Sequence, residues 1–551
     1  MRRKIIRIMR FLGRVLPVST AIMFLYAPLR ADPSSVADRS WPPASAVISR
    51  LAMCQHKGQE TIRPLRITAI HWGGAPYPGG DEAKCRQLER DIAMAHGTGA
   101  QYIGSVNGRG FHHHGMDSEA VRLLDGKPMT DAAMNNAIYK CSLNPKMSAA
   151  FLEVMKGCID VGTDGLILDS WQGEGWTLCF CESCTRFYRE CLKKHRDDPR
   201  LAAIKDLDPE TFDYGAYLRA RGCTAATPIR DLPLGPMLAG FRFDELIRTK
   251  RTLFESIRQY AASRGRRGFH LTANVYDMPA TTFAVSDLLD YFSVELPYFG
   301  SFDGYPPQGT SIALHKKGRM AGKRCVIQPG CLDTARALID KTSTATLFKT
   351  WIAEAYASGN LFDMIPREWA GYQNGQVVWL DMPVQQLVPY YRFIKSHPEI
   401  YTETVSLAKT AVLYSMAAAS ADPKGYEREY RAVCKLLYDA HRQFDVILAG
   451  EGRWNTTEPS ADQLGRYDAI VAIRPQQLRD DTVSRLIEWK MGKRKMVLCG
   501  KSRTGQPGYP RLCAAALGRE VPSAELPSFV PYIKSRDADT RRDLSPTGRS
   551  G

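Results

Sequence analysis

Residues 162–190 read G-T-D-G-L-I-L-D-S-W-Q-G-E-G-W-T-L-C-F-C-E-S-C-T-R-F-Y-R-E, and this stretch decides how the chain is interpreted. Its apolar run Leu166–Leu168 ends in Asp169. Buried parallel strands are typically apolar runs, and catalytic carboxylates lie at their carboxyl ends. Three cysteines follow at once, at Cys179, Cys181 and Cys184. Because three thiolates need only one more ligand to complete a tetrahedral zinc site, the segment predicts a strand-end acid beside a metal-binding loop.

Working outward from this strand, eight strand-like runs can be identified between residues 66 and 365, with helical patterns mostly between them. The runs are Arg66–His71, Gln101–Val106, Ala137–Cys141, Gly165–Ser170, His270–Val275, Asp290–Glu295, Arg324–Gln328 and Asn360–Ile365. The helical patterns include Asp81–His96, Lys146–Val161, Phe241–Arg264 and Ser343–Ser358. Eight alternating units over about 300 residues predict a (β/α)8 TIM barrel, an α/β fold, over residues 60–400. A doubly wound open sheet is the structural alternative.

A second pattern begins near Lys409 and predicts a smaller flavodoxin-like α/β domain over residues 409–516. Its apolar strand candidates are Ala411–Tyr414, Phe444–Ala449, Asp468–Ala472 and Lys495–Cys499. Helical stretches at Tyr426–Gln443 and Thr482–Met491 separate them. The polar and basic residues 531–551 are expected to form a disordered tail.

The first 31 residues are typical of a secretory signal peptide, with a basic head, an apolar stretch and a small residue, Ala31, for cleavage. We therefore expect an exported protein, with no later segment apolar enough to span a membrane. The net charge of the whole chain is +16. Seven basic and no acidic residues lie in the first 31 residues, so the chain without the signal peptide would have a net charge of about +9. No basic run is interleaved with aromatic residues, so nucleic acid is not an expected partner.

Other motifs follow in an order that can be compared with known enzymes. They are Tyr139-Lys140-Cys141-Ser142-Leu143-Asn144-Pro145, Phe241-Arg242-Phe243-Asp244, Thr272-Ala273-Asn274 and Val294-Glu295-Leu296-Pro297-Tyr298. Together with the three cysteines they resemble the glycoside hydrolase family 42 β-galactosidases. The resemblance covers roughly residues 60 to 510. It implies a barrel hydrolase acting on a carbohydrate, with Cys141 as the fourth zinc ligand, and an amidotransferase-like domain that assembles a homotrimer.

The chain departs from this family at both catalytic positions. The family's acid/base glutamate stands in an Asn-Glu pair at the end of strand four, where this chain has Asp169-Ser170. The family's nucleophilic glutamate ends strand seven, where this chain has Gln328-Pro329. The family's catalytic mechanism is therefore not carried over unchanged.

Three acidic residues are the catalytic candidates. Asp169 is interpreted as the proton donor, the alternative being a structural aspartate bound to loop amides. Glu174, between Trp171 and Trp176, is an alternative acid. Glu295 could face Asp169 as the second carboxylate of a glycosidase, or it could accept a bond from a substrate hydroxyl.

Further side chains near the expected strand ends are candidates for substrate binding. They are Trp72, His113, Asn274, Tyr298, Glu368 and Trp369, with Asp277 and Asp363 as spare acids. The histidines His71 and His112–His114 could instead hold a catalytic metal. In an oxidising compartment the cysteines could pair as disulfides rather than bind zinc, and Cys191 could replace one ligand. Cys499 is interpreted as a buried structural cysteine rather than a nucleophile.

Three functions remain open from the sequence. The first is a secreted glycoside hydrolase with a structural zinc. The second is an inactive glycan-binding or scaffold relative of such an enzyme, which the missing glutamates favour. The third is a metal-dependent hydrolase that uses the histidines.

Overall fold

The structure of the chain is a computed structural model. The described residues are 41–49, 65, 67–77, 82–113, 115–171, 177–199, 201, 208–275, 278–295, 311–328, 344–373, 376–381, 384–401, 405–491 and 494–499. The side chains of residues 133, 344, 347, 367–373 and 376–381 are not described.

Eight parallel strands form one sheet in the order in which they occur along the chain. They are β1 (Ile48–Ser49), β2 (Ala69–Gly73), β3 (Gln101–Asn107), β6 (Gly165–Asp169), β7 (His270–Asn274), β8 (Tyr291–Glu295), β9 (Cys325–Gln328) and β10 (Leu361–Phe362). A parallel bridge between Ser49 and Met364 joins the first strand to the residues after the last, and Met364 N–H donates to Ile48 O at 2.9 Å. The ring closes, which confirms the predicted (β/α)8 barrel.

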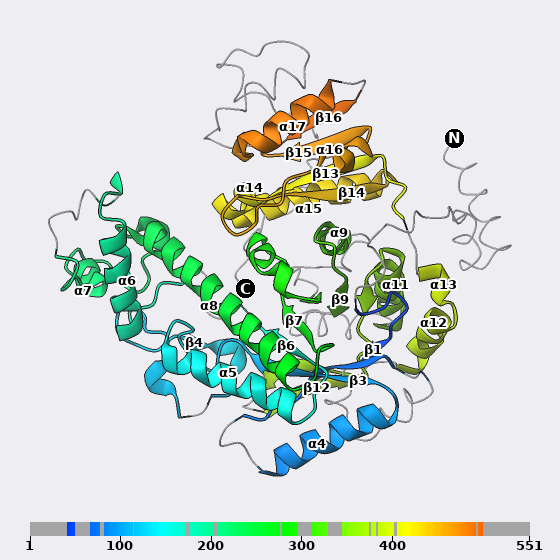
Figure 1. Cartoon of the computed structure of the whole chain (residues 1–551), viewed down its shortest axis with the longest axis horizontal. Helices are drawn as coiled ribbons and strands as arrows, with labels where there is room; N and C mark the ends of the chain where they lie inside the picture. Colours follow the sequence, from blue (N-terminus) through cyan, green and yellow to red (C-terminus); the bar gives the residue numbers. More distant parts are fainter. Residues whose placement is uncertain are drawn as a thin grey trace, which may run out of the picture. The chain divides into compact units, whose positions relative to one another are not determined.

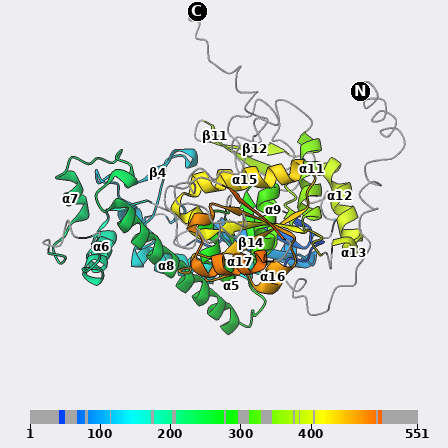
Figure 2. The same ribbon diagram turned by 90° about the horizontal axis from the view of Figure 1, so that it is seen from above.

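Helices connect most of the barrel strands. They are α4 (Glu82–Gly97), α5 (Pro145–Asp160), α8 (Gly235–Ser263), α9 (Ile312–Met320), α11 (Thr344–Ala357) and, after the barrel, α12 (Val384–Ser396) and α13 (Pro398–Tyr401). Helix α5 begins where Asn144 accepts a bond from Lys146 N–H and Pro145 occupies the first turn. Helices α11, α12 and α13 lie side by side in both views (Figures 1 and 2). The four predicted barrel helices are confirmed to within a few residues, except that α8 begins six residues before Phe241.

Two predictions about the barrel strands were wrong. Residues Ala137–Ile138 form β5, which pairs antiparallel with β4 (Thr130–Asp131) outside the barrel. The first barrel strand is instead β1, which lies before the predicted start of the domain at residue 60. Strand β1 is only two residues long and follows Pro42 and Pro43, so it lacks the length by which a strand is recognised in sequence.

The connections after β3 and β6 are enlarged and pack on each other. The second one carries α6 (Glu182–Lys194) and α7 (Tyr214–Arg219) before α8 begins. Their buried side chains form a hydrophobic cluster of their own, separate from the barrel core. Short 3-10 turns complete the connections at Asp117–Glu119, Ala132–Met134, Ile229–Asp231, Ala280–Ala284 (η9), Ser286–Leu288 (η10) and Pro475–Gln477. After β10, a hairpin of β11 (Arg367–Gln373) and β12 (Gln376–Asp381) follows.

A second, four-stranded parallel sheet has the order β14-β13-β15-β16. Its strands are β13 (Thr410–Ser415), β14 (Phe444–Ala449), β15 (Ala469–Ile473) and β16 (Lys495–Cys499), and its helices are α14 (Met416–Ala421), α15 (Pro423–Asp439), α16 (Ala461–Gly465) and α17 (Asp480–Lys490) (yellow to orange in Figure 1). All four predicted strands are present, in the order of a flavodoxin-like sheet. Cys499 is buried at the end of β16, and burial raises the pKa of its thiol to about 12, which fits the structural role expected for it.

This second sheet shares a continuous hydrophobic core with the barrel. In the described part of the connection between β7 and β8, 3-10 turns replace an α-helix, and Phe283 from η9 contacts both Phe292 of β8 and Tyr414 of β13. The loop after β14 also reaches the barrel, because Trp454 packs on Phe243 of α8 with ring centroids 5.2 Å apart. The second sheet thereby covers a face of the barrel that a helix would ordinarily cover.

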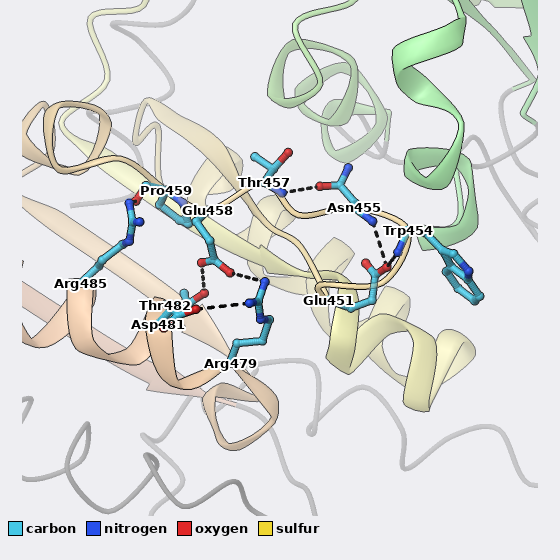
Figure 3. A network of polar contacts seen from close by, with 10 residues as sticks. All are labelled: Glu451, Trp454, Asn455, Thr457, Glu458, Pro459, Arg479, Asp481, Thr482 and Arg485. Carbon is cyan, nitrogen blue, oxygen red and sulfur yellow. Dashed lines mark hydrogen bonds and ion pairs between the residues drawn. The ribbon is translucent and has the colours of Figure 1, made fainter. Parts of the chain in front are cut away.

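Polar contacts stiffen that loop (Figure 3). The Glu451 carboxylate accepts bonds from the backbone N–H groups of Trp454 and Asn455, at 2.5 and 3.0 Å. Farther along, Glu458 pairs with Arg479 at 3.0 Å. The Asn455 amide donates to Phe283 O at 3.1 Å, so the loop is fixed both within itself and to the barrel.

A buried ion pair also joins the two parts, and its disruption gives a testable stability effect. Lys317 of α9 is 1% exposed, and its Nζ donates at 2.7 Å to both Met278 O and the Glu427 carboxylate of α15. We expect Lys317→Met to lower the free energy of unfolding by about 3–5 kcal/mol, because Glu427 loses its cation in a buried place. The double variant Lys317→Met/Glu427→Gln should recover much of this loss. Chemical denaturation measures both, and equal loss in the two variants would contradict the ion-pair explanation.

Among the described residues, no helix combines the length and the apolar character needed to cross a bilayer.

Candidate active site and metal centre

Four polar side chains meet at the carboxyl ends of neighbouring barrel strands. Asn107 ends β3, Asp169 ends β6, Asn274 ends β7 and Glu295 ends β8. Asn107 Nδ2 donates to Asp169 Oδ2 at 2.9 Å. Asn274 Nδ2 donates to Asp169 Oδ1 at 3.0 Å and to Glu295 Oε1 at 2.6 Å. The two predicted acids therefore face each other across one amide nitrogen.

The separation of the two carboxylates follows from these bonds. Since Asp169 Oδ1 and Glu295 Oε1 bind the same nitrogen at 3.0 and 2.6 Å, the two oxygens are at most the sum of these distances apart, about 5.6 Å. Glycosidases that form a covalent intermediate have carboxyl groups about 5–5.5 Å apart, whereas inverting enzymes leave about 6.5–9.5 Å for a water molecule. The upper limit for these two oxygens is compatible with the first spacing and lies below the second.

A tyrosine contacts the strand end that carries Asn107. The Asn107 backbone N–H donates to the Tyr77 hydroxyl at 3.0 Å. Burial raises the pKa of the Tyr77 phenol above its ordinary value, and the charge of Asp169 acts in the same direction. Tyr77 is therefore a neutral support for the strand end that carries Asn107.

Near the end of β2, an irregularity in the strand pairing contains both His71 and Trp72. The pairing of β2 with β3 shifts register between Ile70 and Gly73, and Trp72 takes a left-handed conformation with φ of 58°. His71 is fully buried, and its ring nitrogens lie 2.8 Å from the Tyr291 hydroxyl and 3.4 Å from an Asp363 oxygen. Trp72 is partly buried at this strand end, and its role in substrate binding stays a prediction.

Of the other predicted binding residues, only His113 has a described side-chain environment that is independent of the two acids. His113 is 5% exposed and packs edge-on between the rings of Tyr77 and Phe151, at 5.4 and 5.0 Å. Glu174 and Tyr298, with the spare acid Asp277, lie outside the described residues. Glu368 and Trp369 belong to β11, in the part of the chain where side chains are not described.

The four predicted metal ligands come together. The sulfur atoms of Cys141, Cys179, Cys181 and Cys184 all lie within 4.8 Å of one another, so this group could hold a metal ion. The Cys141 and Cys184 sulfurs are 3.6 Å apart, which is too long for a disulfide and close to the spacing around a tetrahedral ion with bonds of about 2.3 Å. Cys191 is buried on the same helix as Cys184 but is not part of the group.

The surroundings of the cysteines fit a metal-bound thiolate group. Backbone N–H groups of Arg122 and Cys181 donate to Cys179 Sγ at 3.4 and 3.5 Å. The Arg242 guanidinium, 1% exposed, lies 4.0 Å from Cys141 Sγ. A buried cation and several N–H donors are expected around anionic sulfur, because they offset the charge left by four thiolates on a divalent ion.

The histidines do not gather in the same way. Within the described ranges, the cysteine group is the only set of three or more His, Cys, Asp or Glu side chains placed to hold a metal ion. His71 is engaged inside the barrel and His112 packs on Tyr77, while His114 lies outside the described residues. These positions do not favour the predicted alternative of a histidine-based metal hydrolase.

Sequence reasoning missed Asn107, which binds Asp169 directly. It stands one residue beyond the predicted strand Gln101–Val106, where asparagine is usually interpreted as a turn residue. Its register opposite Asp169 in the pairing of β3 with β6 reveals its role.

Comparison with known proteins gives two kinds of relatives. No protein-family model matches the chain. The α-agarase of Alteromonas agarilytica is 23% identical over 286 residues, which are 50% of this chain and 19% of the agarase. The α-agarase of Thalassotalea agarivorans is 23% identical over 295 residues, with 51% and 19% covered. The matched segment thus spans about a fifth of these curated relatives.

Solved structures show the same architecture. A β-galactosidase from Halorubrum lacusprofundi superposes with a TM-score of 0.58 at 16% identity, covering 84% of this chain and 74% of its own. The family 42 β-galactosidase of G. stearothermophilus gives 0.53 at 12% identity, covering 82% and 71%. An α-L-fucosidase from Paenibacillus thiaminolyticus gives 0.55 at 13% identity, covering 85% and 66%. The chain therefore has a glycoside-hydrolase-like barrel fold, and its expected likeness to family 42 β-galactosidases is confirmed at the level of the fold.

Proposed function

We propose that this protein is a glycoside hydrolase that uses Asp169 and Glu295 as its pair of catalytic carboxyl groups. The observation that carries the proposal is the single amide nitrogen of Asn274, which binds both acids at the mouth of a glycosidase-like barrel. Two carboxyl groups at this separation suit a double displacement, in which one attacks the anomeric carbon and the other manages the leaving-group proton.

The proposed substrate class follows from the relatives of this chain, an α-agarase and a β-galactosidase. An agarase acts on agar and a β-galactosidase on galactosides, so we propose a galactose-containing oligo- or polysaccharide. The partly buried Trp72 and the buried His113 are proposed to contact sugar rings near the acids.

For the cysteine group we propose a structural zinc ion, because four sulfur ligands leave no open position for catalysis. The zinc would hold together the connections that follow β3 and β6. Export and assembly into a homotrimer through the second sheet stay predictions from the sequence.

The test is hydrolysis of aryl α- and β-galactosides and of agarose by the purified chain, with the anomeric configuration of the first product followed by NMR. We expect turnover with retained configuration, because the spacing of the carboxyl groups leaves no room for a water molecule between them. An inverted product would contradict the proposed pairing of Asp169 with Glu295. Binding of these glycans without turnover would instead favour the alternative of an inactive glycan-binding protein.

A further inference from the structure

Both carboxylate oxygens of Asp169 accept bonds from amide nitrogens. Oδ2 accepts from Asn107 at 2.9 Å and Oδ1 from Asn274 at 3.0 Å, while the Ser170 hydroxyl lies farther from Oδ1, at 3.3 Å. An amide N–H can donate a hydrogen bond but cannot accept one. Both oxygens of Asp169 therefore meet hydrogen-bond donors, which fixes the orientation of this carboxylate.

The orientation of the Asn107 amide is fixed by its other contacts. Its Oδ1 accepts a bond from the Arg109 backbone N–H at 3.0 Å, so its Nδ2 must be the atom that faces Asp169. The backbone is equally constrained, because Gly108 N–H donates to Asp169 O at 2.6 Å. A side chain at Gly108 would come within 2.7 Å of the carbonyl oxygens of Asp169 and Ser170. The ends of β3 and β6 thus form one rigid unit that presents an N–H group to Asp169.

We propose that Asn107 and Asn274 are positioning residues that hold Asp169 as an ionised nucleophile, and that Glu295 is the residue that carries the proton. This inference rests on the proposed glycosidase function and assigns the roles within it. It reverses the roles expected from the sequence, in which Asp169 is the proton donor.

The reaction then proceeds in two balanced steps. In the first, an Asp169 oxygen attacks the anomeric carbon, the bond to the leaving oxygen breaks, and Glu295 gives its proton to that oxygen. In the second, water attacks the same carbon, gives a proton to Glu295, and Asp169 leaves as a carboxylate. The Asn274 amide, which binds both acids, keeps them at the distance that both steps need.

Azide rescue tests the two roles separately. The substrate is a 2,4-dinitrophenyl glycoside of a sugar that the wild-type chain hydrolyses, because its leaving group departs without a proton. In Asp169→Gly, azide should attack from the vacated side and give a glycosyl azide of inverted configuration. In Glu295→Gly, Asp169 still forms the covalent intermediate, so azide should replace water and give an azide of retained configuration.

The outcomes separate this inference from the proposed function. If the wild-type chain hydrolyses glycosides but the two variants give the opposite products, or azide rescues neither variant, the assigned roles are overturned while the hydrolase function stands. If the wild-type chain hydrolyses no glycoside, the proposed function and these roles both fail.

A second measurement tests Asn107 as a positioning residue. Asn107→Asp keeps the shape of the side chain but places a carboxylate against Asp169, and we expect the acidic limb of the kcat/KM profile to move to higher pH. Asn107→Ser, which adds no charge but takes the amide donor away from Asp169 Oδ2, should lower kcat and leave KM nearly unchanged, because the substrate still binds but the attacking carboxylate is no longer held in place. A residue with only a structural role would lower the free energy of unfolding in Asn107→Ser without this separation of kcat from KM, and that result would overturn the positioning role of Asn107.

Discussion

Asp169→Asn is expected to lower kcat for glycoside hydrolysis by about 10⁴-fold or more, because an amide cannot replace the attacking carboxylate. The variant also puts an amide NH2 where two amide donors now meet a carboxylate, at 2.9 and 3.0 Å. The new NH2 group would face the amide NH2 of either Asn107 or Asn274, and one hydrogen bond would be lost. We therefore expect the free energy of unfolding to fall by about 1–3 kcal/mol. Steady-state kinetics on an aryl glycoside and chemical denaturation measure the two effects separately.

A matched control lies at the opposite end of the same strand. Asp164 immediately precedes β6, and its carboxylate accepts bonds from Tyr102 N–H and pairs with His96, at 2.8 and 2.7 Å. Asp164→Asn should therefore affect stability but keep the wild-type kcat. If Asp169→Asn retained as much activity as this control, the catalytic role proposed for Asp169 would be refuted.

Cys184→Ser is expected to release the bound metal and to lower the free energy of unfolding by about 4–5 kcal/mol or more. The cysteine group joins Cys141, at the end of the connection after β3, to three cysteines in the connection after β6. Losing one ligand leaves the other three sulfur ligands without their ion, and it leaves the buried Arg242 without the negative charge of the metal–thiolate group. Elemental analysis of the purified wild-type chain should give about one zinc per molecule, and the variant should contain much less.

Helix α6 supplies the control for this substitution. Cys191 is buried on the same helix as Cys184 but lies outside the sulfur group. Cys191→Ser makes the same substitution at another buried cysteine of this helix. The variant should therefore keep the metal and lose much less free energy of unfolding. Equal losses in the two serine variants, or wild-type protein that contains no metal, would rule out the metal centre.

Much of the architecture could be read from local patterns. Strands β6, β8 and β9 are buried on both faces. Each is a largely apolar run, so it can be recognised as a strand from the sequence alone. The cysteines that could hold a metal ion could be found because three of them, Cys179, Cys181 and Cys184, are close in sequence. Strand β1 could not be found, because two residues carry no periodic signal.

The sequence by itself indicated most strands of the ring, the second parallel sheet, the cysteines that could hold a metal ion and two acids at strand ends. Only the tertiary structure decided which side chains meet those acids, because the register between strands brings Asn107 and Asn274 against Asp169. The three residues lie far apart in the chain, and their hydrogen bonds depend on the relative heights of β3, β6 and β7 in the closed barrel. A local pattern specifies that a strand ends in a polar residue, but the closure of the sheet determines which polar residues meet.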